Sequence, residues 1–123
     1  MDKECLECGM MNSIPVFDIT DWNINERCLK CDAVLILQSD GSTHTCDIAH
    51  GNETVDQALA KLHQHLNFAI NNYTRRVRLI VGGGLIKEEV QGLLYFYQQQ
   101  GYIVSYAVDS RNAGTINVNI RPS

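Results

Sequence analysis

Hydrophobic positions in the second half of the chain follow two periods, one typical of helices and one typical of strands. From Asn52 onward, apolar residues recur every three or four positions, which predicts a helix with one buried stripe. The stripe comprises Val55, Ala58, Leu59, Leu62, Leu66, Ala69, Ile70 and Tyr73. Thr54 and Gln57 have the spacing of a capping box at its start. A second helix is predicted over residues 86–100, and Gly101 favours its termination there.

Four runs rich in β-branched residues surround these helices. Residues 46–49, 77–81, 102–108 and 115–121 are each predicted to form a strand. Together with the helices they give the element order βαβαββ. This order predicts the α/β fold class, and more closely an α+β two-layer sandwich in which both helices cover one face of a mixed sheet.

Alternation within the predicted strands separates an inner face from an outer face. Val77, Leu79 and Val81 would face the helices. On the outer face the pattern places Arg76, Arg78, Asn117, Asn119 and Arg121. Arginine and asparagine make bidentate hydrogen bonds to phosphates and base edges, so this face is predicted to bind nucleic acid. The alternatives are a solvated sheet face and a surface on which the N-terminal region docks.

Four regularly spaced cysteines dominate the first 45 residues. Cys5 and Cys8 form one C-x-x-C pair, and Cys28 and Cys31 form a second after nineteen intervening residues. Two such pairs complete the tetrahedron that Zn²⁺ prefers in closed structural sites, which leaves no open position for catalysis. The alternatives are two disulfides or redox thiols. The fifth cysteine, Cys46, is expected to pack as a small apolar residue, with substitution as a ligand as the alternative.

Short apolar runs around these pairs predict the rest of the N-terminal module. Residues 14–19 are predicted to form a strand, and residues 33–38 to pair with 43–46 in a hairpin. This arrangement resembles a zinc ribbon, so the sequence predicts a zinc-ribbon-like module at 1–45 and an α/β domain at 46–123. About 45 residues bury little core, and the metal would therefore supply much of the folding free energy.

The charge is distributed unevenly between these two parts. The net charge is −4, and residues 1–45 carry −5 whereas residues 46–123 carry +1. The first part should repel phosphate, so nucleic-acid binding would depend on local placement of basic side chains. No apolar stretch reaches the roughly 18 residues needed to span a bilayer. The polar N-terminus lacks the features of a signal peptide, and we expect a cytoplasmic protein, where thiols stay reduced.

Residues with catalytic or anion-binding chemistry follow two of the predicted strands. Asp47 and His50 end the first strand, and Gly82–Gly84 end the second, just before a helix that carries Lys87 in its first turn. Ligands in such sheets bind beyond the carboxyl ends of strands, where helix N-termini attract anions. The alternatives are a structural histidine and an ordinary tight turn. His63 and His65 are expected to face solvent or the edge of the helix's exposed face, and His44 is assigned no role.

The motifs of the second part resemble those of the Smr (small MutS-related) domain. That family carries a D-L-H-G motif before a long helix, an H-G-x-G type loop after a strand, and a closing G-x-G-x-x-x-V-x-L segment. The corresponding stretches here are Ile48–Gly51, Val81–Gly84 and Ala113–Ile120. His50 matches the family histidine, and Gly82 and Gly84 match the loop glycines. In ungapped register Ile48 stands where the family has aspartate, and Val81 where many members have a second histidine.

This resemblance implies a fold similar to the C-terminal domain of translation initiation factor three. It also implies binding of RNA or DNA, endonuclease activity in many members, and in some a link to ribosomes. We therefore expect phosphate to bind near Gly82, Gly83, Gly84, Lys87, Arg75, Arg76 and Arg78. Cleavage would use His50 with Asp47, and Mg²⁺ in the case of a nuclease. The alternative is a non-catalytic interaction module whose acidic residues 1–45 contact a ribosome or another protein.

Overall fold

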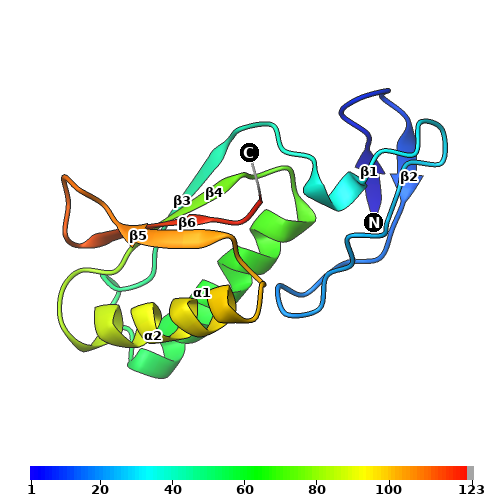
Figure 1. Ribbon diagram of the computed structural model, residues 1–123. Coiled ribbons are helices and arrows are strands. Elements are labelled where there is room, and N and C mark those ends of the chain that lie inside the picture. Colours follow the sequence, from blue (N-terminus) through cyan, green and yellow to red (C-terminus); the bar gives the residue numbers. More distant parts are fainter. Residues whose placement is uncertain (122–123) are drawn as a thin grey trace.

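Two helices cover one face of a four-stranded sheet in the second part of the protein (Figure 1). The computed structural model describes residues 1–121. The elements of this part are β3 (Thr43–Asp47), α1 (Val55–Asn71), β4 (Arg76–Ile80), α2 (Leu85–Gln99), β5 (Ser105–Val108) and β6 (Thr115–Asn119). The strand order is β3-β4-β6-β5, with β3 and β4 parallel and the other pairs antiparallel. The predicted two-layer βαβαββ sandwich is confirmed.

Local signals in the sequence set the ends of both helices. Thr54 accepts a hydrogen bond from the Gln57 backbone and receives one in return from the Gln57 side chain, which completes the predicted capping box. Gly101 adopts the left-handed backbone (φ 80°) that ends α2. The chain then bonds back to that helix through the Tyr102 amide and the Tyr97 carbonyl, so β5 begins only at Ser105.

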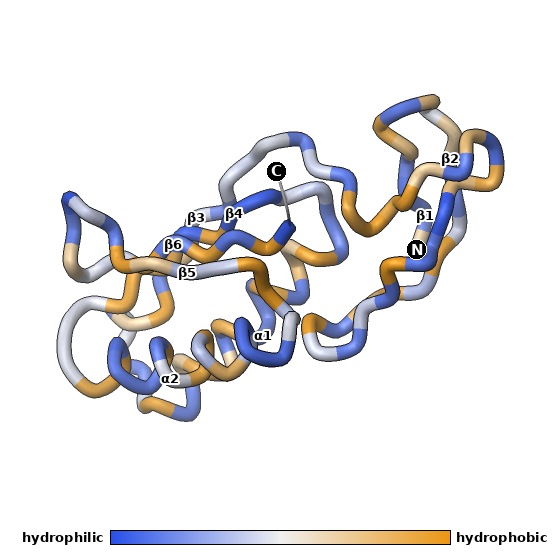
Figure 2. Tube along the Cα trace, in the orientation of Figure 1, coloured by the Kyte–Doolittle hydropathy of each residue, from blue (hydrophilic) through white to orange (hydrophobic). Residues whose placement is uncertain are grey.

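The core lies between the sheet and the helices, and alternation along the strands selects which residues enter it. Val77, Leu79, Ile116, Val118 and Ile120 are fully buried. They pack with apolar residues of α1 and α2, and Figure 2 shows hydrophobic and hydrophilic residues interspersed along both helices. The predicted inner face of the sheet is therefore confirmed.

Arg121 departs from this alternation, and its predicted place on the outer face is wrong. β6 ends at Asn119, so the strand period no longer governs position 121. The Arg121 side chain is 1% exposed and donates five hydrogen bonds to main-chain carbonyls. The acceptors are Ile36, Ala69, Ile70, Asn72 and Thr74. Burial lowers the pKa of Arg121 to about 10, and it is not available to bind phosphate.

The N-terminal module contains little regular structure. Strands β1 (Asp2–Glu4) and β2 (Met11–Ser13) pair antiparallel, and a single 3-10 turn covers Leu35–Leu37. The predicted strand at 14–19 and the hairpin between 33–38 and 43–46 are therefore wrong. Leu35 and Ile36 are fully buried from within a turn, and residues 43–47 instead pair with β4. β3 crosses the predicted boundary between residues 45 and 46, and the division into two domains stays a prediction.

One face of α1 holds the module against the α/β domain. The side chains of Asn67 and Asn71 accept hydrogen bonds from the backbone amides of Ile19 and Phe17, both at 2.7 Å. One turn earlier, His63 Nε2 lies 2.6 Å from a carboxylate oxygen of Asp18. The three helix residues are four apart, so they form a single stripe. His63 is therefore half-exposed at the edge of the helix's exposed face, where it contacts the module.

No helix within residues 1–121 combines the length and the hydropathy that crossing a bilayer requires.

Candidate functional site

Asp47 and His50 form a hydrogen-bonded pair at the end of β3. One Asp47 oxygen accepts the backbone amides of Ala49 (2.9 Å) and His50 (3.0 Å), and the other lies 2.6 Å from His50 Nδ1. The hydrogen bond from the Ala49 amide, followed by those from His50, lowers the pKa of Asp47. The carboxylate thus orients the imidazole and leaves Nε2 for a ligand. Although Ile48 holds the aligned position of the family aspartate, the turn after β3 lets Asp47 reach the histidine.

His50 lies beside the glycine turn that follows β4. β3 and β4 are parallel neighbours, and the Ile48 amide bonds to the Ile80 carbonyl at 3.1 Å. A Cβ atom placed on Gly82 would be 3.8 Å from His50 Nε2. Gly82 has a positive φ of 64°, a conformation that favours glycine. The predicted neighbourhood of the histidine and the glycine turn is therefore confirmed.

The two strand ends enclose an open cavity of about 330 Å³. Its lining residues are Ala49, His50, Val81, Gly82, Gly83, Leu85 and Ile86. Leu85 and Ile86 begin α2, and the first N–H groups of a helix have no acceptor within it. An anion in the cavity would meet those amides and the imidazole. Gly84 caps α2 and Lys87 lies half-exposed in its first turn, and neither lines the cavity.

A second polar surface covers the sheet face opposite the helices. Arg76 and Arg78 of β4 pair in register with Asn119 and Asn117 of β6. Arg76 Nε donates to Asn119 Oδ1 at 3.2 Å, and Asn119 in turn donates to Ser105. This sheet surface, defined by Arg76, Arg78, Asn117 and Asn119, brings together the outer-face residues other than Arg121. Arg75 precedes β4 and is half-exposed.

One acidic side chain tempers the charge of the sheet surface. Asp109 accepts a hydrogen bond from Asn117 at 3.1 Å and lies 3.9 Å from Arg78. The Arg111 backbone amide, with Asn117, lowers the pKa of Asp109, so the carboxylate is charged at neutral pH. Within residues 1–121, Arg76 forms no ion pair with a carboxylate, so its positive charge is not offset in this way.

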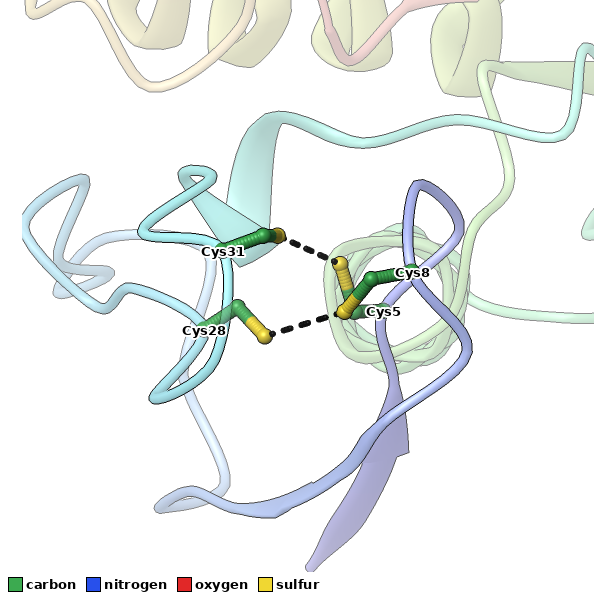
Figure 3. A group of neighbouring side chains, drawn as sticks. All are labelled: Cys5, Cys8, Cys28 and Cys31. Carbon is green, nitrogen blue, oxygen red and sulfur yellow. Dashed lines mark hydrogen bonds between the residues drawn. The ribbon is translucent and has the colours of Figure 1, made fainter.

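The four predicted cysteine ligands converge from the two C-x-x-C turns (Figure 3). Cys5 Sγ lies 3.5 Å from Cys31 Sγ, and Cys8 Sγ lies 3.5 Å from Cys28 Sγ. All four sulfurs lie within 4.8 Å of one another. Zinc–sulfur bonds of about 2.3 Å in a tetrahedron place sulfurs roughly 3.8 Å apart, so the cluster fits one Zn²⁺. The separations far exceed a disulfide bond of about 2.05 Å, and all five cysteines are free.

Neighbouring donors point at the sulfurs of this cluster. Gln38 Nε2 lies 3.3 Å from Cys5 Sγ, and the Lys30 amide and Asn12 Nδ2 lie 3.4 and 3.6 Å from Cys28 Sγ. Donors of this kind favour thiolate over thiol, which is the form that binds metal. Sequence spacing identifies the four ligands, but it gives no signal for these supporting donors.

Comparison with known proteins identifies the fold of the α/β part. No protein-family model matches the chain, and no curated protein matches it. Among solved structures, the Smr domain of Thermus thermophilus MutS2 matches with a TM-score of 0.55 and 23% identity. The match covers 99% of that domain and 64% of this chain, a share close to that of residues 46–123. The α/β part has the Smr fold.

The Smr fold of the α/β part agrees with the resemblance seen in the motifs. The loop glycines and His50 occupy adjacent strand ends in this fold, as their order in the sequence predicts. Val81, in place of a second family histidine, is 1% exposed and contributes only an apolar wall. The groups at the cavity that could act as acid or base are therefore the His50 imidazole and the Asp47 carboxylate bound to it.

His44 and His65, to which the sequence assigns no role, are in direct contact. His44 Nε2 is 2.9 Å from His65 Nδ1, and the Cys46 sulfur lies within 4.8 Å of both nitrogens. His65 is half-exposed and packs against β3, which agrees with a place at the edge of the helix's exposed face. The spacing of His44 and Cys46, two apart on one strand, is the sequence signal that places them on one face.

Proposed function

We propose that the protein binds RNA or DNA through the cavity beside His50 and the sheet surface. The observation that carries this proposal is the convergence of His50, the Gly82–Gly83 turn and the start of α2 on one open cavity. Amides at a helix N-terminus and an imidazole suit a phosphate group. The Smr fold supports the proposal, because the family resemblance implies the same class of ligand.

The sheet surface would extend the contact along a polynucleotide. Arg76 and Arg78 are the two cations that it offers, and Asn117 and Asn119 supply amide groups. Because the whole chain carries −4, attraction to nucleic acid depends on these local cations and not on bulk charge. Arg75 and Lys87 lie near enough in sequence to add to either surface. Arg121 is excluded by its burial.

The double substitution Arg76→Ala/Arg78→Ala tests the sheet surface. Affinity for labelled RNA and DNA should fall, and the dependence of log affinity on log salt should flatten. The expected change in slope is about 0.9 per lost phosphate contact on duplex DNA and about 0.7 on a single strand. Fluorescence anisotropy over a salt series measures both quantities.

The matched control is Arg27→Ala/Lys30→Ala, which removes the same charge from the exposed part of the N-terminal module. It should leave the slope unchanged. Equal losses in the two double variants would mean that only net charge matters, and unchanged binding by Arg76→Ala/Arg78→Ala would refute a role for the sheet surface.

We propose strand cleavage as a second candidate function, supported by the Asp47–His50 pair. A carboxylate that orients Nδ1 leaves Nε2 to transfer a proton at a phosphodiester in the cavity. His50→Ala should lower the cleavage rate by about 10²- to 10⁴-fold, as for loss of a general acid or base. Asp47→Asn, which changes only the group that orients the ring, should have a smaller effect.

Cleavage should be followed on labelled RNA and DNA, with and without Mg²⁺, beside a binding measurement on each variant. Retained binding by His50→Ala, with loss of cleavage, supports the catalytic assignment. Identical cleavage by the wild type and His50→Ala would point to a contaminating nuclease and remove this candidate.

We also propose that Cys5, Cys8, Cys28 and Cys31 hold a structural Zn²⁺. Four thiolates saturate a tetrahedral ion, so this metal would stabilise the fold and not enter a reaction. The convergence of the four sulfurs and the donors around them support the proposal.

A further inference from the structure

A second group of metal-binding side chains lies between the edge strand β3 and α1. His44 and Cys46 occupy alternate positions of β3, and their register partners on β4, Val77 and Leu79, are fully buried. Both side chains therefore point from the strand toward the helix layer. His65 approaches from α1, between the buried positions Leu62 and Leu66.

The three donor atoms of this group lie close enough to share one ion. They fall within 4.8 Å of one another, and the two imidazole nitrogens are 2.9 Å apart. Zinc–nitrogen bonds of about 2.0–2.1 Å in a tetrahedron place two nitrogens roughly 3.3 Å apart and their ring centroids roughly 5 Å apart. The centroids of His44 and His65 are separated by 5.1 Å. The ring centroids thus have a suitable spacing, whereas the two nitrogens face each other at 2.9 Å. Sharing one ion would require the nitrogens to separate to roughly 3.3 Å and to turn toward it.

We propose that His44, Cys46 and His65 form a second Zn²⁺ site, separate from the four-cysteine cluster. Imidazole and thiolate are both ligands that suit Zn²⁺. Three protein ligands leave one coordination position open, in contrast to the closed four-sulfur site. Since both histidines are half-exposed, water or a small anion can fill that position.

The surroundings indicate what the ion would do. Phe68 packs over His44 with ring centroids 4.7 Å apart and shields one side of the site. The ion would join α1 to β3, which has a neighbouring strand on one side only. Cys46 directly precedes Asp47, so the ion would also brace the strand end that carries the Asp47–His50 pair.

A metal-free account of the same residues is a direct hydrogen bond between the two rings, with Cys46 as an apolar core residue. In that account one nitrogen carries a proton and the other accepts it. The two accounts differ in the amount of metal that the chain binds, and not in its activity.

Metal content of the full chain separates them. Wild-type protein loaded with excess Zn²⁺ and desalted should retain two zinc ions per chain by mass spectrometry of the metal. His65→Gln and Cys46→Ser should each retain one. Loss of a single outer partner of a metal ligand costs about 10- to 100-fold in affinity, so loss of a ligand should exceed that range. Thr45→Ala, an exposed residue between the two strand ligands, is the matched control and should retain two.

A second readout covers the case of a variant that folds poorly. With Co²⁺ in place of Zn²⁺, the spectrum of the wild type minus that of His65→Gln should contain a thiolate-to-cobalt charge-transfer band. The spectrum of the wild type minus that of Thr45→Ala should contain no such band, because the control keeps the site. One zinc per wild-type chain would overturn the proposal, as would two in both ligand variants or a wild-type Co²⁺ spectrum identical to that of His65→Gln. These outcomes do not depend on nucleic-acid binding, so they neither support nor contradict the proposed function.

Discussion

Replacing Cys5 by serine should unfold the N-terminal module while the α/β part keeps its structure. The module has two three-residue strands and one 3-10 turn, so little regular secondary structure holds it together. Zinc binding to small structural sites supplies about 10–16 kcal/mol at neutral pH, and this becomes folding free energy. Loss of one of four ligands should therefore remove most of the module's stability.

Amide hydrogen exchange measures this effect residue by residue. The amides of Cys5 and Ile14 are hydrogen-bonded within the module, and that of Ile19 is bonded to Asn67 of α1; all three should lose protection. Those of β4 and β6 should keep theirs. Leu29→Ala is the control, because Leu29 lies between two ligands and is 84% exposed. Full protection of Ile14 and Ile19 in Cys5→Ser would contradict a metal-dependent module, and a strong chelator should reproduce the Cys5→Ser result in the wild type.

Replacing Arg121 by methionine should lower the free energy of unfolding by about 3–5 kcal/mol, the range for removing one partner of a buried charged group. The guanidinium donates to the carbonyls of Ala69 and Ile70 at the end of α1, where a helix leaves its last carbonyls without i+4 partners. It also donates to the Ile36 carbonyl of the module. Methionine fills a similar volume and donates no hydrogen bond. Several buried carbonyls would then be unsatisfied, each at a cost of about 1–3 kcal/mol before relaxation.

Urea denaturation measures the loss, and two further variants interpret it. Arg121→Lys keeps a charge but has three donors in place of a planar fork, so it should recover only part of the stability. Arg27→Met removes an exposed arginine and should change the free energy of unfolding by less than about 0.5 kcal/mol. A loss equally small in Arg121→Met would show that water satisfies those carbonyls.

The parts of the fold predicted from sequence are those in which one strong local signal decides the structure. The α1 stripe, its capping box and the glycine after α2 fix two helices, and the alternation of β4 and β6 fixes their inner faces. The C-x-x-C spacing likewise predicts the four cysteines whose sulfurs converge. At these positions local preference and tertiary packing agree.

The failures occur where packing between distant segments decides. An apolar run such as 33–38 is compatible with a strand and with a buried turn. In the structure, Leu35 and Ile36 are buried within a 3-10 turn. The place of Arg121 depends on carbonyls 47 to 85 residues away, which no local period contains. His65 likewise meets a strand that lies about 20 residues earlier in the chain.

In the candidate site, the sequence identified His50 and the glycine turn but left Asp47 in doubt. Aligning the motif position by position places Ile48, and not Asp47, at the family aspartate. The turn after β3 bends the chain so that the Asp47 carboxylate nevertheless reaches the imidazole. The supporting donors of the cysteine cluster were missed for the same reason, since Asn12 and Gln38 come near the sulfurs only when the chain folds.

The position of β6 has a consequence for how the chain folds as it is synthesised. β6 lies between β4 and β5, yet it is made after both of them. Until residues 115–119 emerge from the ribosome, β4 presents an unpaired edge and β5 has no neighbour. Exposed strand edges promote association between chains. A longer delay between the emergence of β5 and that of β6 should therefore increase aggregation of the nascent chain, and a shorter delay should reduce it.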